Sequence, residues 1–344
     1  MVYKRNFRVM TALFILAAML IFPVHLFAQE ATETVEHEAG FYYTVQKGDT
    51  LWDLSSQFSD NPWLWPNLWS ENSQISNPHW IYPGERIRLF HVKGVDTFIT
   101  KNIKENQSKE PEPKAKTLYY YYSPINRIGF IKKQAVTPLG TIFKVEEDKT
   151  LVSVGDIIYI RPNADYSFQM GTKYTVYRTL KPIVDEKTKN LVGIQHYITG
   201  VAVITKKEPD FVVAKVVKSY RSIALNDLLM PYKKRSPKIA LTQSKNDLNG
   251  KIIVAEEHDK NIGDHTVAFI NKGGQDGVKI GQSYSIYYQE KAELNKKSDR
   301  EILLTPNILG SLLVLHTEPT TSTVLITQSD RSIDPGAKIS SPIK

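Results

Sequence analysis

Residues 43–54 read YTVQKGDTLWDL and residues 77–89 read NPHWIYPGERIRL, and these two stretches decide the fold of the first part of the chain. All five tryptophans of the 344 residues lie within or between these stretches, from Trp52 to Trp80. Aromatic side chains bury large areas and pack against one another. We therefore expect a compact unit with its own aromatic core, and we expect the function to reside there.

Both ends of this window have the pattern of a β-strand. Residues 41–45 are aromatic and β-branched, and they end at the turn sequence KGD, residues 47–49. Near the other end, Pro83 and Gly84 interrupt the chain before residues 86–89, in which charged and apolar side chains alternate. The window is therefore predicted to begin and end with a strand.

Two short helices are predicted between these strands. Thr50 and Asp53 have the spacing of a helix-capping pair, and apolar residues then follow at helical spacing. Pro66 suits the first turn of a second helix, which Asn72 would end. The side chains predicted to turn into the core are Leu51, Trp52, Leu54, Phe58, Leu68 and Trp69.

This window resembles a LysM domain, the small βααβ module that binds glycans containing N-acetylglucosamine, such as peptidoglycan. The resemblance is carried by YTV at 43–45, KGDTL at 47–51, Asn72, Ile75, NP at 77–78, IYPGE at 81–85, Ile87 and Leu89. The window departs from the family pattern in two places: its middle, residues 60–72, is longer and richer in tryptophan, and Glu85 replaces the usual glutamine. Both departures concern the sugar preference rather than the fold.

The resemblance implies a glycan-binding groove between the turn after the first strand and the loop before the second. A glycan offers hydroxyls, amides and apolar faces, so its site needs fixed backbone groups and flat apolar surfaces. Gly48 permits a close approach of the backbone, and Trp80 can stack on a sugar ring. The residues predicted to bind glycan are Gly48, Asp49, Thr50, Leu51, Ser76, Asn77, Pro78, His79, Trp80 and Ile81.

Several of these aromatic and polar residues also fit a structural role. Asp49 suits a helix cap as well as a sugar contact. Trp63 and Trp65 fit the core and the surface equally. His79 has no second ligand nearby at metal-binding spacing, so no metal site is predicted there.

Residues 1–28 have the pattern of a secretory signal peptide. Three basic residues precede an apolar run from Val9 to Phe22, and we expect cleavage after Ala28. The alternative is an uncleaved segment that anchors the protein in the inner membrane. The sequence contains no cysteine, which excludes disulfides, thiol catalysis and a lipid-modified cysteine.

The charge of the chain argues against nucleic acid as a partner. The formal net charge of +8 includes three basic residues of the leader, which leaves 41 basic and 36 acidic residues in the exported part. This small surplus favours an anionic wall or membrane surface, and it lacks the clustered basicity of a nucleic-acid binder. No kinase, second membrane span or C-terminal sorting signal is recognisable, so we expect the periplasm or cell envelope of a bacterium.

The rest of the chain is predicted to contain a linker and two copies of one domain. Residues 92–117 are polar and charged and lack periodicity, as a linker does. Beyond them, a shift of 110 residues aligns residues 140–223 with residues 250–333, and 18 of these 84 pairs are identical. We therefore expect two repeats, over residues 118–233 and residues 234–344.

Each repeat contains short β-branched runs between Gly, Pro, Asn and Asp turns, which is typical of small barrels or sandwiches. The tyrosines at 119–122 are predicted to form an edge strand on the first repeat. The predicted fold class is therefore multi-domain, with a small α+β LysM module of βααβ order, residues 40–91, followed by two all-β barrel- or sandwich-like repeats.

The repeats lack a recognisable catalytic constellation. Neighbours on a strand point to opposite faces, so the recurring pairs Glu146-Glu147 and Glu256-Glu257 are interpreted as solvated. The basic run at 233–235 is interpreted as a solvated linker. We predict no catalytic residue, no metal and no cofactor, because the remaining candidates neither recur nor form ligand spacings: His196, His258, His265 and His316.

The sequence thus predicts a non-catalytic envelope protein that binds peptidoglycan or another N-acetylglucosamine-containing glycan through its one LysM domain. The repeats would dock an envelope protein or act as spacers. The alternatives are a wall-modifying enzyme and a structural subunit of an envelope machine.

Overall fold

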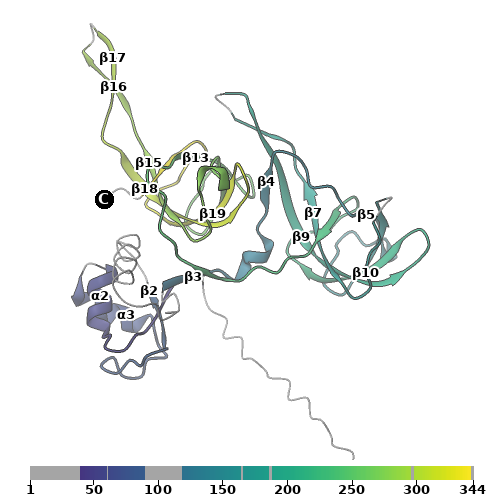
Figure 1. Ribbon diagram of the computed structural model, residues 1–344, viewed down its shortest axis with the longest axis horizontal. Helices are drawn as coiled ribbons and strands as arrows, with labels where there is room; N and C mark the ends of the chain where they lie inside the picture. The colour runs from purple at the N-terminus through teal and green to yellow at the C-terminus, as the bar shows by residue number, and fades with distance from the viewer. Residues whose placement is uncertain are drawn as a thin grey trace, which may run out of the picture. The chain divides into compact units, whose positions relative to one another are not determined.

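The computed structural model describes residues 39–59, 61–89, 118–163, 166–185, 188–295 and 298–341 (Figure 1). Every described residue belongs to one compact unit, Glu38–Lys344. The predicted signal peptide and the predicted linker, residues 92–117, lie outside the described residues. No helix in the described part is long and apolar enough to cross a membrane.

The N-terminal module has the predicted order of strand, two helices and strand. Its two end strands pair antiparallel, with Tyr43 opposite Ile87. The elements are β1 (Gly40–Thr44), α2 (Leu51–Ser59), the 3-10 turn η1 (Pro62–Leu64), α3 (Trp65–Ser70) and β2 (Arg86–Leu89). The prediction of a small α+β module is confirmed.

Helix α2 begins where the capping pair predicts. The Thr50 hydroxyl accepts a hydrogen bond from the backbone N–H of Asp53 at 3.1 Å and donates one to the Asp53 carboxylate at 2.7 Å. These bonds satisfy one of the free N–H groups at the helix start. The predicted core residues Leu51, Leu54 and Phe58 are all buried.

The carboxamide of Asn72 joins the end of helix α3 to strand β2. Asn72 is 1 % exposed. Its Nδ2 donates to the carbonyls of Leu68 at 2.7 Å and Arg88 at 2.9 Å, and its Oδ1 accepts from the Arg88 N–H at 2.7 Å. A single side chain therefore fixes both the helix end and the strand.

The sheet of this module continues into the C-terminal part of the chain. Strand β3 (Leu118–Tyr121) pairs with β1 on one edge and with β12 (Lys238–Ala240) on the other, which gives the order β12-β3-β1-β2. The sequence predicts residues 119–122 at the edge of the first repeat. The structure instead places strand β3 inside this sheet, where Tyr120 packs edge-to-face on Phe41 at 4.8 Å.

The first β unit contains a ring of six strands. The ring follows the order β5-β6-β10-β9-β7-β11 and returns to β5, and β4 and β8 pair with β9 outside it. The strands are β4 (Phe130–Lys132), β5 (Gly140–Val145), β6 (Ile157–Pro162), β7 (Lys173–Thr179), β8 (Ile183–Val184), β9 (Leu191–Lys207), β10 (Val212–Ser219) and β11 (Leu228–Pro231).

The second β unit is a closed six-strand barrel of order β13-β14-β19-β18-β15-β20 (Figure 1). A separate two-stranded hairpin, β16 with β17, is inserted between β15 and β18. The strands are β13 (Asn249–Ala255), β14 (Val267–Ile270), β15 (Ser283–Tyr288), β16 (Lys291–Asn295), β17 (Ser298–Leu303), β18 (Asn307–Thr317), β19 (Ser322–Ser329) and β20 (Lys338–Ser340). The predicted β-rich fold of this region is confirmed.

The two β units use the same succession of antiparallel pairings. When each strand of the first ring is matched to the strand at the same place in the second, all six pairings correspond. Each unit also contains one isolated bridge, Val152 with Ile223 and Ile262 with Ile333, and these residues are spaced by 110 positions. Tyr174 and Tyr284 are buried in equivalent strands.

We predict that Asn72→Ala destabilises the N-terminal module by about 1–3 kcal/mol, because it leaves buried backbone groups without partners. All five tryptophans lie in this module, so tryptophan fluorescence in a urea titration of the full chain follows the unfolding of this module. Asn67→Ala, at an exposed position of α3, is the control and should unfold like the wild type. Equal midpoints for the two variants would contradict the role assigned to Asn72.

Candidate functional site

The first loop, residues 46–50, is held by the carboxylate of Asp49. This carboxylate accepts hydrogen bonds from the Tyr43 hydroxyl at 2.8 Å and from the Gln46 N–H at 2.7 Å. Burial, together with the bond to Asp49, raises the pKa of Tyr43. Asp49 thus closes the turn and leaves the capping of the helix to Thr50. Gly48 lies at the tip with φ of +96°, a conformation that favours glycine.

The second loop, residues 76–81, is a turn built around Asn77. The Asn77 Oδ1 accepts from the His79 N–H at 3.0 Å, and the Asn77 carbonyl accepts from the Trp80 N–H at 3.1 Å. These bonds fix the backbone beneath the Trp80 ring, which is 66 % exposed. Ile81 turns the other way and packs on the core.

Backbone hydrogen bonds tie the chain just before the first loop to the turn that follows the second loop. Val45, just before the first loop, donates to the Glu85 carbonyl at 2.9 Å, and its own carbonyl accepts from Gly84 at 3.0 Å. The Glu85 carboxylate accepts from the Tyr82 N–H at 2.9 Å, so this departure from the family pattern has a structural role. The turn that follows the second loop is therefore tied to the start of the first loop.

The predicted glycan-binding residues differ in what they present to solvent. Gly48, Thr50, Ser76, Asn77, His79 and Trp80 are exposed, and Asp49, Pro78 and Ile81 are half-buried. The Leu51 side chain lies in the core, so only its backbone remains for a ligand. The exposed part of the set combines backbone groups, small polar side chains and one large aromatic ring, as a glycan site requires.

The sequence predicts both Trp52 and Trp69 in the core, and the structure confirms this for Trp69 only. Trp69 packs on the core and donates its indole N–H to the Ile75 carbonyl at 2.7 Å, as expected of a core residue. The prediction that Trp52 is buried is wrong, because its position on α2 is turned away from the face that Leu51 and Leu54 bury. Trp52 forms an exposed pair with Trp63 instead.

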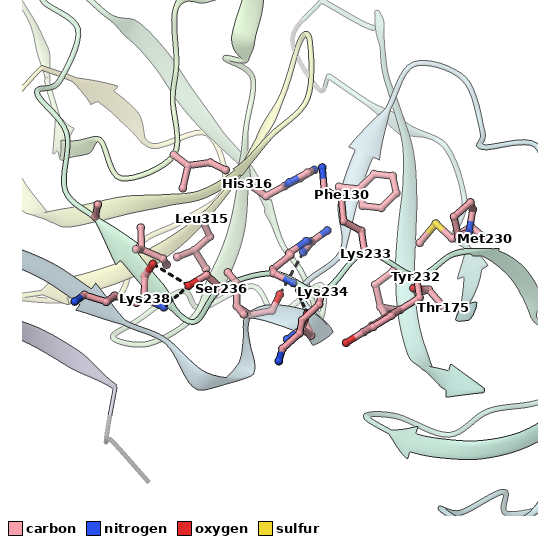
Figure 2. A pocket seen from close by; sticks show the side chains of 18 of the residues that line it. Phe130, Thr175, Met230, Tyr232, Lys233, Lys234, Ser236, Lys238, Leu315 and His316 are labelled. Carbon is pink, nitrogen blue, oxygen red and sulfur yellow. Dashed lines mark hydrogen bonds between the residues drawn. The ribbon is translucent and has the colours of Figure 1, made fainter. Parts of the chain in front are cut away.

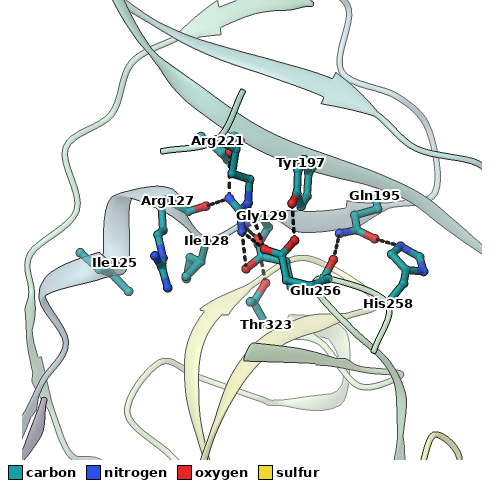
Figure 3. Close-up of polar contacts among 12 residues, drawn as sticks. Ile125, Arg127, Ile128, Gly129, Gln195, Tyr197, Arg221, Glu256, His258 and Thr323 are labelled. Atoms are coloured by element: carbon teal, nitrogen blue, oxygen red, sulfur yellow. Dashed lines mark hydrogen bonds and ion pairs between the residues drawn. The ribbon is translucent and has the colours of Figure 1, made fainter. Parts of the chain in front are cut away.

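A polar cluster joins the two β units, and Glu256 is its centre (Figure 3). The Glu256 carboxylate is 3 % exposed, accepts from the Gly129 N–H at 2.5 Å and lies 3.2 Å from Arg221. Burial raises the pKa of Glu256, and the charge of Arg221 acts against this shift. Arg221 also binds Glu257 at 2.5 Å and lies over the Tyr197 ring.

This cluster corrects the interpretation of the recurring glutamate pairs as solvated. Glu146 and Glu147 are exposed, but Glu256 is buried because the segment around Gly129 covers it. Strand spacing could not reveal this contact, since its partners lie 127 positions apart in the sequence.

Further hydrogen bonds extend the junction between the β units on both sides. Gln195 donates to the Glu256 carbonyl at 2.8 Å and contacts the His258 ring at 2.8 Å (Figure 3). Thr323 donates to the Gly129 carbonyl at 2.8 Å. These side chains bind residues of the opposite β unit, so they hold the two units together.

A cleft of about 580 Å³ lies where the chain passes from the first β unit to the second (Figure 2). Phe130, Met230 and Leu315 contribute apolar side chains, and Lys233 and Lys234 are exposed beside them. The interpretation of residues 233–235 as solvated is correct for the two lysines. It is wrong for the third residue of the run, because Arg235 donates to the carbonyls of Ile125 and Ile128.

Two further histidines of the β units have structural partners, as His258 does. His196 is buried against the Phe130 ring, its Nε2 accepts from the Val136 N–H at 2.9 Å, and burial lowers its pKa. His316 contacts the Glu318 carboxylate at 2.9 Å. Within the described ranges, no three His, Cys, Asp or Glu side chains are placed to hold a metal ion.

Comparison with known proteins identifies the N-terminal module. Residues 43–90 match the family model of the LysM domain. LysM domains generally bind peptidoglycan and other N-acetylglucosamine-containing glycans, and the proteins that carry them are typically associated with the cell envelope. A search of curated proteins found no match to the chain.

We predict that Arg221→Ala destabilises the β units by about 3–5 kcal/mol, because it leaves the buried Glu256 charge without its partner. Denaturant unfolding followed by far-ultraviolet circular dichroism measures the change. Arg331→Ala is a matched control, since Arg331 is exposed at the equivalent place after β19 and should unfold like the wild type. If both variants shift equally, the junction does not depend on Arg221.

Proposed function

We propose that this LysM-domain protein is a non-catalytic, exported component of the bacterial cell envelope that binds peptidoglycan through the first and second loops. The match of residues 43–90 to the LysM family carries the proposal. The exposed Trp80 ring in the second loop supports it. The N-terminal leader supports export to the periplasm, with an inner-membrane anchor as the alternative.

The proposed recognition uses shape and neutral hydrogen bonds rather than charge. The backbone of the loops offers donors and acceptors to the acetamido and hydroxyl groups of the sugar, and Gly48 leaves space for a close approach. Trp80 supplies a flat apolar surface for a pyranose ring. One short groove makes few contacts, so a modest affinity is expected for a single site.

For the β units, we infer two copies of one domain that act as docking modules or spacers. Their equal pairing succession and the 110-residue spacing of their isolated bridges support this inference. A role as a structural subunit of an envelope machine is the second candidate. The observation that favours it is the core of the LysM module, which continues through Tyr120 and Ile239 to Leu315 of the barrel.

In a sedimentation assay with purified sacculi, we expect the full-length protein to pellet and Trp80→Ala to bind roughly tenfold more weakly, as loss of a central aromatic contact implies. Glu71→Ala, an exposed substitution in the same module, is the control and should pellet like the wild type. Tryptophan fluorescence melts should show both variants folded. A wild-type protein that stays in the supernatant would overturn the proposed function.

The non-catalytic part of the proposal predicts that sacculi incubated with purified protein release no soluble muropeptides above a buffer blank. Chromatography of the supernatant measures the release, with a known muramidase as the positive control. Release of soluble muropeptides by the purified protein, above the buffer blank, would favour the wall-modifying enzyme instead.

A further inference from the structure

Trp52 and Trp63 form an exposed aromatic pair that neither the core nor the two loops account for. Their ring centroids are 4.8 Å apart with the planes at 79°, and the side chains are 41 % and 73 % exposed. Large aromatic side chains with this exposure on a small module indicate a contact surface. Because Trp63 is the more exposed of the two, most of its side chain remains open to a ligand.

The pair is held in place by its surroundings. Asn61 caps the 3-10 turn by accepting from the Trp63 N–H at 3.0 Å, and Pro62 fixes the backbone between them. The Asn61 carbonyl in turn accepts from the hydroxyl of Ser55, a buried residue of α2, at 2.9 Å. Since the backbone that carries Trp63 is already fixed, less conformational freedom is lost when a ligand stacks on the ring.

Short chain segments connect the pair to both loops. Trp52 follows Leu51 directly, at the end of the first loop. On the other side, Trp65 stands two residues after Trp63, and its ring centroid is 6.3 Å from that of His79 in the second loop. The short segment of residues 62–65 therefore reaches aromatic neighbours of both loops.

Two neutral, exposed side chains lie near Trp52 on α2. Ser56 lies one helical turn beyond Trp52 on the same face of α2, and it is small, neutral and exposed. Gln57, next to it, is also neutral and exposed. The two indole rings present apolar faces, which match the C–H face of a pyranose ring.

We propose that Trp52 and Trp63 form an additional subsite that stacks on a sugar ring beyond those held by the two loops. The inference rests on the proposed function and deepens it, because it makes the ligand an extended glycan strand rather than a single sugar or a chain end. Loops and aromatic pair together would then bind a longer stretch of glycan, and affinity would rise with its length.

Calorimetric titration of the full-length protein with chitotriose and with chitohexaose tests this. We expect the wild type to bind the hexamer more tightly than the trimer. Trp63→Ala should lower hexamer affinity roughly 3- to 10-fold and leave trimer affinity unchanged, because only the longer chain reaches the pair. Trp52→Ala should act in the same way, and Trp63→Phe should retain most of the affinity.

Two control variants separate the subsite from the groove. Trp80→Ala should weaken both oligomers, and Gln57→Ala should weaken neither. Loss of trimer and hexamer binding to the same extent in Trp63→Ala, or no loss in either, would overturn the subsite while the proposed function stands. If the wild type binds neither oligomer, the proposed function fails and the subsite with it.

Discussion

Strand β3 is the constraint on which the arrangement of the described chain depends, because both of its edges are used. One edge pairs with β1 of the LysM module and the other with β12, the strand that leads into the barrel. Two of its residues, Leu118 and Tyr120, are buried in the same core as Leu54 and Phe58. Without β3, the edge of β1 would present unpaired backbone groups, which proteins ordinarily cover.

The parts of the fold that follow local rules could be predicted from the sequence. The capping of α2 by Thr50, the buried stripe of Leu54 and Phe58, and the alternation in β2 all depend on neighbours within a few residues. The place of β3 and the burial of Glu256 depend on partners more than 70 positions away, and no local pattern contains them. Of the candidate site, the loops could be located but the exposed aromatic pair was missed.

Sequence repetition indicates shared architecture, yet it does not assign the same role to matching residues. Arg221 and Arg331 occupy the same place after equivalent strands, but Arg221 binds Glu256 and Glu257 across the junction and Arg331 is exposed. Glu147 likewise matches Glu257, but it is exposed and lies 3.7 Å from a nearby lysine, Lys149. The two β units meet at a single junction. Of two residues that correspond between the repeats, only the one at this junction can make the contact between the units.

The continuity between the module and the barrel decides how glycan binding would act on the whole protein. A LysM domain on a flexible tether gains reach, and its effective concentration near a second site depends on tether length. Here β3 and β12 join the module to the β units through a shared sheet and core. The module therefore has a fixed orientation and lacks the reach of a tethered domain. Binding a glycan strand along the loops and the Trp52–Trp63 pair would therefore set the direction of the β units relative to that strand, even at modest affinity.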